Sequence, residues 1–424
     1  MPRKFYGWWI TAAAFVSFGL SVGIPYYNIG FFYDYFQREF GWTRAQITLG
    51  FPLAAALTLW VGPLVIHRFS PRKLILVGTA LTAVALTGFG KMGSVLWIYY
   101  AFWVVYTIGY FFSGPIPHQL MVSHWFRRNR GKAMGIVYVG VGLMGSLGSF
   151  LVKPLTENFG FHTALMILAG IVLLAWPIVL LVLKDKPSDI GQFPDGDSVA
   201  PAEAAVQSAT FKELLSSWHF WLLLIGSLCS IGSIGAINFH MKFVFLDQGY
   251  AKGSVVDSAW RNASVLILWS SIGGRLLIGG LADRFSKKVV MTVTYFLVAG
   301  TIPLLLAVRP QNEFYLPMFA VLFGFGMGAD YMLIPLMAAE QFGVNSLARA
   351  MALILPVNTI GQTWFPYFVS VLRGDKQPGN YNFAMGVVMM VALIGAVAIL
   401  SLPRHSKLDE TLQLQKPERA SARG

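Results

Sequence analysis

The chain is poor in charge, in acidic residues and in cysteine. Only 12% of its 424 residues are Asp, Glu, Lys or Arg, whereas soluble domains carry about a quarter. A single cysteine, Cys229, excludes a disulfide within the chain. The one acidic cluster, Asp195-Gly196-Asp197, lies in a polar connection, so paired carboxylates for enzyme chemistry are missing from the apolar runs. No connection is long enough for a signalling domain, and no ring of charges repeats as in a channel.

Long apolar runs dominate instead. Hydrophobic residues make up 56% of the chain, and the mean hydropathy is +0.61. A helix needs roughly 20 apolar residues to cross a hydrocarbon layer of ~30 Å. We identify twelve such runs, at 8–33, 45–66, 73–91, 95–123, 134–157, 162–183, 218–246, 260–282, 288–308, 314–338, 347–371 and 382–402. The alternating segments of a membrane barrel are absent from the sequence. These runs predict an all-α membrane protein with twelve transmembrane helices.

Two sequence patterns recur at half the chain length. HRFSPRK at 67–73 matches DRFSKK at 283–288, and HWFRRNRGKAMG at 124–135 matches EQFGVNSLARAMA at 340–352. Repeats of this kind are a common plan of secondary transporters. We therefore expect two pseudo-symmetric six-helix bundles, at 1–183 and 214–403. A flexible cytoplasmic linker at 184–213 would join them, and a cytoplasmic tail would follow from 404 to 424.

The distribution of basic residues predicts the orientation in the membrane. Of 32 Lys and Arg residues, 21 fall on the side that holds both termini and the even connections, and ten fall on the other side. Because cytoplasmic loops carry the excess of Lys and Arg, both termini should be cytoplasmic. We expect the plasma membrane, or the inner membrane if the cell is bacterial. The basic residues are scattered over short hairpins, which does not favour a nucleic-acid partner. We expect a monomer without a cofactor.

Several spans contain helix-breaking residues. Pro25 lies in the first span, and Gly114-Pro115-Ile116-Pro117 lies in the fourth. The tenth span contains Gly324, Gly326 and Gly328, and the eleventh contains Pro356, Gly361 and Pro366. Since carbonyls freed by a break must face protein or water, we expect these breaks to line a cavity.

The repeated hairpins resemble the signature of the major facilitator superfamily, which stands between spans two and three and between spans eight and nine. The second copy retains Gly279, Leu281, Ala282, Asp283, Arg284, Lys287 and Lys288. The first copy has His67 where the acidic residue is expected and Ser70 where the glycine is expected. The resemblance implies that a gating motif is formed by Asp283, Arg284, Gly279, Arg68 and Arg130.

Two further motifs resemble one branch of that superfamily. Trp125-Phe126 is followed by Arg130-Gly131-Lys132-Ala133-Met134-Gly135, and Phe5-Tyr6-Gly7-Trp8-Trp9 precedes the first span. Both look like the monocarboxylate transporters and their oxalate:formate relatives. The resemblance covers the whole chain and implies a secondary active carrier that works by alternating access around a central cavity.

Arg275 is the strongest candidate for binding substrate. It lies about 20 Å into the eighth span when counted from Arg261 at ~1.5 Å per residue. An Arg at such depth costs ~2.5–3.5 kcal/mol on insertion scales and usually faces a cavity or a partner. A guanidinium grips a carboxylate through two parallel hydrogen bonds. Two structural alternatives are that Arg275 reaches the cytoplasmic interface or pairs with Asp283. The resemblance favours substrate binding, because the branch places its substrate-binding Arg in this span.

Other polar residues at membrane depth are candidates for binding and proton transfer. Asp330 follows the glycines of span ten, where loss of water favours the protonated carboxyl, so it could carry a proton or instead pair with Arg275. His240 is a second proton-coupling candidate or an interfacial residue. The substrate-binding candidates beside Arg275 are His118, Tyr331, Asn28 and Asn358. Each has a structural alternative, as a cap for freed carbonyls or as a packing residue.

The proposed cargo is a small organic monocarboxylate such as lactate or pyruvate, with a proton as co-substrate. For proton coupling, the resemblance to the animal members of the branch implies a Lys in the first span and an Asp one turn before the Arg of the eighth span. This chain has neither: its first span has Tyr26, Tyr27 and Asn28, and Ser271 stands one turn before Arg275. One alternative is an oxalate/formate-type anion exchanger, which would need a second deep cation; Lys153 is the nearest candidate. A carrier of an unrelated small solute is a further alternative.

Overall fold

The computed structural model describes residues 5–197, 208–251, 254–312, 314–373 and 381–403. The predicted tail, 404–424, lies outside these residues, as does 198–207 of the predicted linker. The described chain is built of helices, and a single β-bridge joins Arg309 to Asn312 within it. It divides into two compact units: Met1–Glu203 with Leu347–Pro356, and Ala204–Ser346 with Val357–Gly424. Each unit has its own apolar core.

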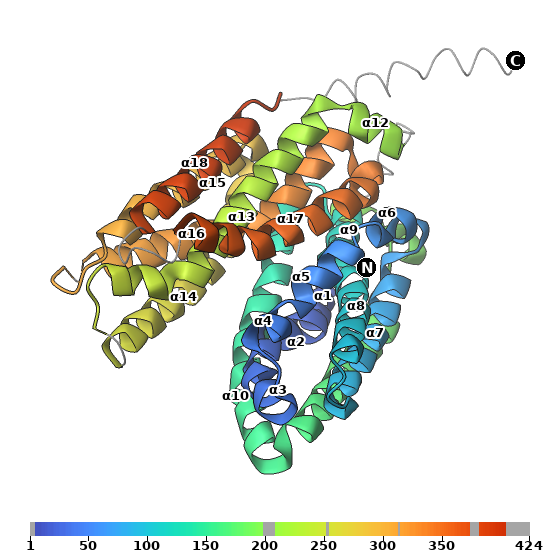
Figure 1. Cartoon of the computed structure of the whole chain (residues 1–424). Helices are drawn as coiled ribbons and strands as arrows, with labels where there is room; N and C mark the ends of the chain where they lie inside the picture. Colours follow the sequence, from blue (N-terminus) through green and yellow to red (C-terminus); the bar gives the residue numbers. More distant parts are fainter. Residues whose placement is uncertain (1–4, 198–207, 252–253, 313, 374–380, 404–424) are drawn as a thin grey trace, which may run out of the picture. The chain divides into compact units, whose positions relative to one another are not determined.

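The first unit holds the first six apolar runs (Figure 1). Its elements are α1 (Gly7–Phe18), η1 (Gly19–Gly23), α2 (Ile24–Asn28), η2 (Ile29–Phe32), α3 (Tyr33–Phe40), α4 (Arg44–Thr48), α5 (Gly50–Leu57), α6 (Val61–Val65), η3 (Ile66–Arg68), α7 (Pro71–Lys91), α8 (Leu96–Ser113), α9 (Pro115–Trp125), α10 (Arg130–Leu173), α11 (Ala175–Leu181), η4 (Pro187–Ile190) and η5 (Pro194–Gly196).

The second unit begins with a short capped helix and continues with long ones. Its elements are α12 (Phe211–Ser216), α13 (Trp218–Asp247), α14 (Ser254–Arg284), α15 (Lys287–Ala307), α16 (Tyr315–Phe342), α17 (Val344–Arg373) and α18 (Tyr381–Leu400). Part of α17, Leu347–Pro356, groups with the first unit. At the start of α12, the Thr210 hydroxyl accepts from the Glu213 N–H, and the Glu213 carboxylate accepts from the Thr210 N–H. This reciprocal pair ends the linker.

All twelve apolar runs fall on helices, so the prediction of an all-α membrane fold is confirmed. By length and composition, nine helical stretches among the described residues can cross a membrane. One of them, Arg130–Leu181, is 52 residues long and contains run five and most of run six. Its helix turns at Gly160, whose φ of +75° suits glycine. The second run is shorter than predicted, since its apolar helix Gln46–Leu57 is followed by a turn and α6.

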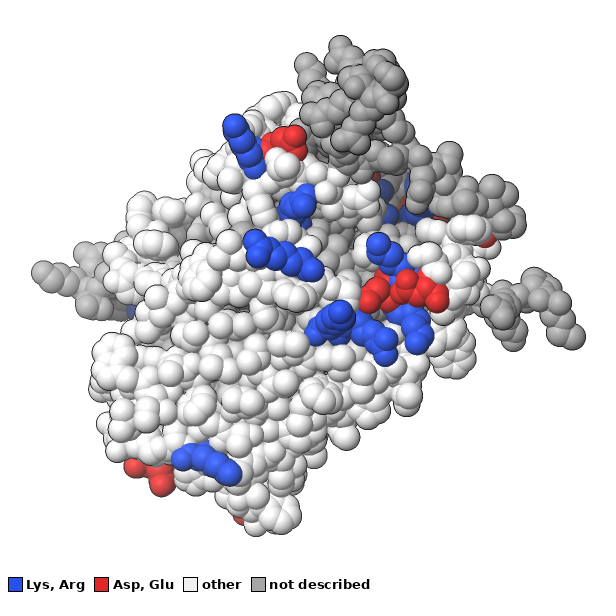
Figure 2. All heavy atoms as spheres, turned by 90° about the vertical axis from the view of Figure 1, so that its right-hand side faces the viewer, with Lys and Arg blue, Asp and Glu red and all other residues white. Residues whose placement is uncertain are grey.

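Large apolar side chains point away from the cores. Trp97, Phe150 and Leu181 are 76%, 80% and 76% exposed. The face shown in Figure 2 is mostly uncharged, and its few Lys, Arg, Asp and Glu side chains lie in small groups. Exposure of this kind is costly in water and suits the hydrocarbon of a bilayer.

The predicted interruptions occur in the first and fourth spans. The first span passes through a π-helical segment, η1, and a 3₁₀ segment, η2. In the fourth span, Gly114 separates α8 from α9, and its ψ of −140° is non-helical. The glycines and prolines of spans ten and eleven do not interrupt their helices, because α16 and α17 are continuous.

The glycines of span ten serve close packing instead. A Cβ on Gly324 would lie 2.4 Å from the Ile267 carbonyl oxygen, and one on Gly328 would lie 2.2 Å from the Ser271 carbonyl oxygen. On the facing helix, a Cβ on Gly274 would lie 2.2 Å from the Phe325 carbonyl oxygen. Helices α14 and α16 therefore pack backbone against backbone, which small residues permit.

The first part of the linker is bound to the first unit, so the expectation of a flexible connection does not hold for residues 184–197. Asp195 is the main contact: its Oδ2 accepts hydrogen bonds of 2.8 Å from the backbone N–H groups of both Arg127 and Arg128. Asp197 pairs with the Arg128 guanidinium. The Trp125 indole donates to the Lys184 carbonyl at 3.0 Å. These contacts hold the linker against the turn between α9 and α10.

Candidate functional site

Arg275 lies on α14 in the second unit and is only 8% exposed. Its Nε and Nη1 atoms are buried, and no described residue accepts a hydrogen bond from them. Neither Asp283 nor any other described carboxylate forms an ion pair with it, so the structural alternative of a pair with Asp283 is not observed. A buried guanidinium without an acceptor is costly, because it has lost water without gaining a partner. Arg275 therefore retains the capacity to bind an anion.

Asp330 lies on α16 and is fully buried. The Ser230 hydroxyl of α13 donates to its Oδ2 at 2.5 Å, while its Oδ1 has no hydrogen-bond partner among the described residues. The Tyr295 hydroxyl of α15 lies beside this carboxyl but outside hydrogen-bond geometry. No cation is paired with Asp330 within the described chain. The alternative of an ionised partner for Arg275 is therefore not observed.

Tyr331 and Asn358 join α17 to its neighbours. The Tyr331 hydroxyl donates to Oε1 of Gln362 at 2.6 Å. Oδ1 of Asn358 accepts from the Ser227 hydroxyl of α13 at 3.1 Å. Both side chains have structural bonds, and their predicted roles in substrate binding stay predictions.

His240 belongs to a network at the end of α13. Its Nε2 lies 2.8 Å from the Pro366 carbonyl, which can only accept, so Nε2 carries the proton. Nδ1 then accepts from the Tyr381 hydroxyl at 2.8 Å. The Arg373 guanidinium lies 4.7 Å above the Tyr381 ring and 3.7 Å from Oδ1 of Asp247. The network ties α13, α17 and α18 together, and the predicted role of His240 in proton coupling stays a prediction.

His118 and Asn28, in the first unit, satisfy carbonyls near the helix interruptions. The His118 Nδ1 donates to the Gly114 carbonyl at 2.8 Å, its Nε2 lies 2.8 Å from the Ser17 hydroxyl, and its ring stacks on Phe18. The Asn28 Nδ2 donates to the carbonyls of Ile24 and Gly145 at 2.8 and 3.0 Å. Their substrate-binding roles are untested predictions, and these bonds support the structural alternative.

The hairpin residues hold helix ends together. Arg130 donates from Nε and Nη2 to the carbonyls of Phe126 and Ser123, at 3.1 and 3.4 Å, and so caps the end of α9. In the second unit, Lys287 forms an ion pair of 2.7 Å with Glu340 at the end of α16. Of the other predicted gating residues, Arg68 and Arg284 are exposed, Asp283 is half-buried and Gly279 is buried. Gating by these residues stays a prediction.

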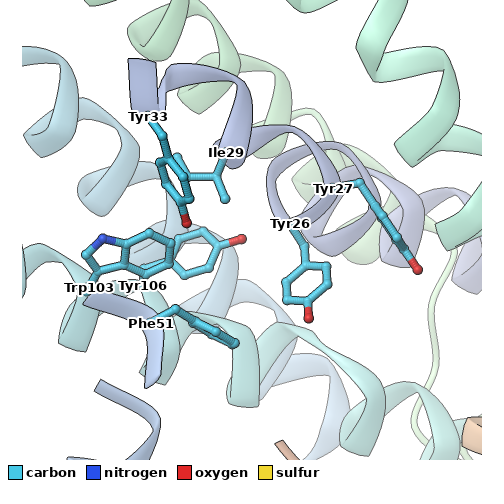
Figure 3. A pocket seen from close by; sticks show the side chains of 8 residues that line it. Tyr26, Tyr27, Ile29, Tyr33, Phe51, Trp103 and Tyr106 are labelled. Carbon is cyan, nitrogen blue, oxygen red and sulfur yellow. The ribbon is translucent and has the colours of Figure 1, made fainter. Parts of the chain in front are cut away.

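One feature was missed at the sequence level, a cavity of about 270 Å³ inside the first unit (Figure 3). The lining residues are Tyr26, Tyr27, Ile29, Gly30, Tyr33, Phe51, Trp103 and Tyr106. None of them is charged. The available signal was the spacing of Tyr26, Ile29 and Tyr33, and of Trp103 and Tyr106, which puts each set on one helical face. Among the described residues, no three His, Cys, Asp or Glu side chains group as metal ligands.

Comparison with known proteins agrees with this architecture. Residues 10–366 match the sequence profile described as Major Facilitator Superfamily. Monocarboxylate transporter 12 of Rattus norvegicus is 25% identical over 399 residues, which cover 87% of this chain and 79% of the relative. Monocarboxylate transporter 11 of Homo sapiens is 26% identical over 422 residues, which cover 95% and 84%.

A solved structure shows the same fold at low identity. The proton:xylose symporter XylE, bound to 6-bromo-6-deoxy-D-glucose, superposes with a TM-score of 0.68 at 12% identity, over 98% of this chain and 100% of that chain. The profile match, the helical architecture and the similarity to named monocarboxylate transporters give one conclusion. The chain belongs to the major facilitator superfamily and resembles its monocarboxylate transporters.

Proposed function

We propose that this protein is a secondary active transporter that moves a small organic monocarboxylate, of the lactate or pyruvate kind, together with a proton. It works by alternating access in the plasma membrane, or in the inner membrane of a bacterial cell, with both termini in the cytoplasm. Arg275 binds the carboxylate. The names of its relatives support this substrate class.

The observation that carries the proposal is the state of Arg275. It is a buried guanidinium that donates no hydrogen bond to a described residue. A carboxylate would supply both the missing charge and the missing acceptors, and hydrogen bonds to charged groups contribute ~1.5–3 kcal/mol each. A neutral solute would leave the charge unbalanced.

An anion exchanger of the oxalate/formate kind is less well supported. Such a carrier would use a second cation at membrane depth to balance a dianion. The side chain of Lys153, the candidate from the sequence, is 67% exposed, and its Nζ lies 3.9 Å from Oε1 of Glu157. It therefore does not provide a second buried charge.

Asp330 is the favoured proton carrier. It is fully buried and bonded to a neutral hydroxyl, and it is not paired with a cation among the described residues. A carboxyl in such surroundings can exchange between protonated and ionised forms without breaking an ion pair. His240 is a weaker candidate, because both of its ring nitrogens hold structural bonds.

The test is uptake into liposomes that contain the purified protein, with a panel of labelled carboxylates. Uptake is compared under an imposed pH gradient, with a counter-anion inside, and with neither. We expect accumulation of a monocarboxylate that depends on the pH gradient. Strict dependence on the internal anion would favour the exchanger, and uptake of a neutral solute alone would contradict the proposed substrate class.

A further inference from the structure

Three tyrosine hydroxyls line the aromatic cavity of the first unit without a hydrogen-bond partner among the described residues. Tyr26, Tyr33 and Tyr106 form no hydrogen bond with the described residues. Tyr106 as a whole residue is only 1% exposed, and it lines the cavity. In Figure 3 the hydroxyls of Tyr33 and Tyr106 point into the space between Ile29 and Phe51. A tyrosine hydroxyl that lines a cavity and has no protein partner can donate a hydrogen bond to an acceptor placed there.

The cavity walls are aromatic rings held by one another. Tyr26 stacks on Tyr110 at 5.6 Å between ring centres and meets Phe51 edge-on at 5.8 Å. Trp103 lies 5.6 Å from Phe51 and 5.3 Å from Tyr106. Ring pairs at such distances are attractive and fix the side chains in place. The cavity is therefore preformed by the first unit.

Size and charge narrow the class of ligand. A cavity of ~150 Å³ is known to hold benzene, so the 270 Å³ observed here accommodates one substituted six-membered ring. No Lys or Arg lines it, and burying an unpaired anion would be costly. A sugar would need many more polar partners than three hydroxyls. The walls suit an aromatic ring that stacks against Phe51 and Trp103.

We propose that this cavity is a binding site for an uncharged aromatic ring that bears an oxygen acceptor, held by the hydroxyls of Tyr33 and Tyr106. The ring could come from a transported aromatic carboxylate or from a separate neutral aromatic molecule. The site does not depend on the role given to Arg275, because every lining residue belongs to the first unit.

The test measures calorimetric binding to the full-length protein in nanodiscs. The probes are para-hydroxybenzyl alcohol, which is neutral, para-hydroxybenzoate, which is charged, and cyclohexylmethanol, which lacks the aromatic ring. We expect an aromatic probe to bind more tightly than cyclohexylmethanol. Tyr106→Phe and Tyr33→Phe should each weaken that binding about five- to tenfold, as expected for one hydrogen bond.

The matched control is Tyr35→Phe, since Tyr35 belongs to the same unit but does not line the cavity; this variant should bind the probe as tightly as the unaltered protein. If the alcohol binds as tightly as the benzoate, the ligand is a neutral aromatic. If the benzoate also binds, and the unaltered protein takes it up into liposomes, the ring belongs to a transported carboxylate. Binding that is unaffected by both Tyr106→Phe and Tyr33→Phe, or absent for both aromatic probes, would overturn the proposal.

Ile29→Phe, which fills the cavity without removing a hydroxyl, is a second variant and should abolish binding.

Discussion

Arg275 and Asp330 are both buried in the second unit, on helices α14 and α16, and they form no ion pair with each other. The two helices pack closely through Gly274, Gly324 and Gly328. Their charged residues nevertheless have separate surroundings: Asp330 bonds Ser230, and Arg275 bonds no described residue. In the proposed function, Arg275 binds the carboxylate and Asp330 carries the proton.

The first prediction concerns proton coupling through Asp330. Asp330→Asn keeps the size of the side chain but removes the exchangeable proton. We expect the variant to lose accumulation driven by a pH gradient and to retain exchange of labelled for unlabelled substrate. Both are measured in the same liposomes.

Ser230→Ala is the matched control for Asp330→Asn, because it removes the 2.5 Å hydrogen bond and leaves the carboxyl in place. It should retain gradient-driven accumulation. Equal loss of accumulation and exchange in Asp330→Asn would show that the carboxyl is structural.

The second prediction concerns the packing of α14 on α16. Gly274→Ala would place a Cβ 2.2 Å from a backbone oxygen, whereas Gly273→Ala, its neighbour, meets nothing within 4 Å. Overpacking of a helix interface costs ~1–3 kcal/mol. We expect thermal unfolding in detergent at a clearly lower temperature for Gly274→Ala and no lower temperature for Gly273→Ala. Equal midpoints would refute close backbone packing.

The third prediction concerns the linker. Asp195→Ala removes the acceptor for the N–H groups of Arg127 and Arg128, so the turn between α9 and α10 should open more often. We expect trypsin to cut after Arg127 or Arg128 at least several times faster than in the unaltered protein. Asp195 has a φ of +58°, which Asn tolerates well, so Asp195→Asn should preserve most of the protection. Unchanged cleavage of Asp195→Ala would show that Asp195 does not hold the turn.

The sequence predicted the helical architecture because its signal is strong and local. The long apolar runs, the repeated basic hairpins and the position of Arg275 within an apolar run can all be recognised in the sequence alone. The interruption at Gly114 was also predictable, since Pro115 and Pro117 follow it directly.

The remaining features depend on which helix faces which. Gly324 and Gly328 looked like a helix break, but the facing backbone at Ile267 and Ser271 gives them a packing function. His118 and His240 looked available for chemistry, and the structure uses both nitrogens of each ring. The tyrosine cavity needs helices that are distant in sequence to meet, which periodicity alone does not encode.

The most direct test of the account is carboxylate uptake by Arg275→Lys, which keeps the positive charge and removes the planar fork of donors. Arg261→Lys, at an exposed position on the same helix, is the control, and the thermal midpoint of both variants should match that of the unaltered protein. We predict that Arg275→Lys raises the half-saturation concentration of monocarboxylate uptake, or lowers its rate, by about 10- to 100-fold. Arg261→Lys should have no effect. Full uptake by a folded Arg275→Lys protein would contradict the assignment of Arg275 as the carboxylate-binding residue.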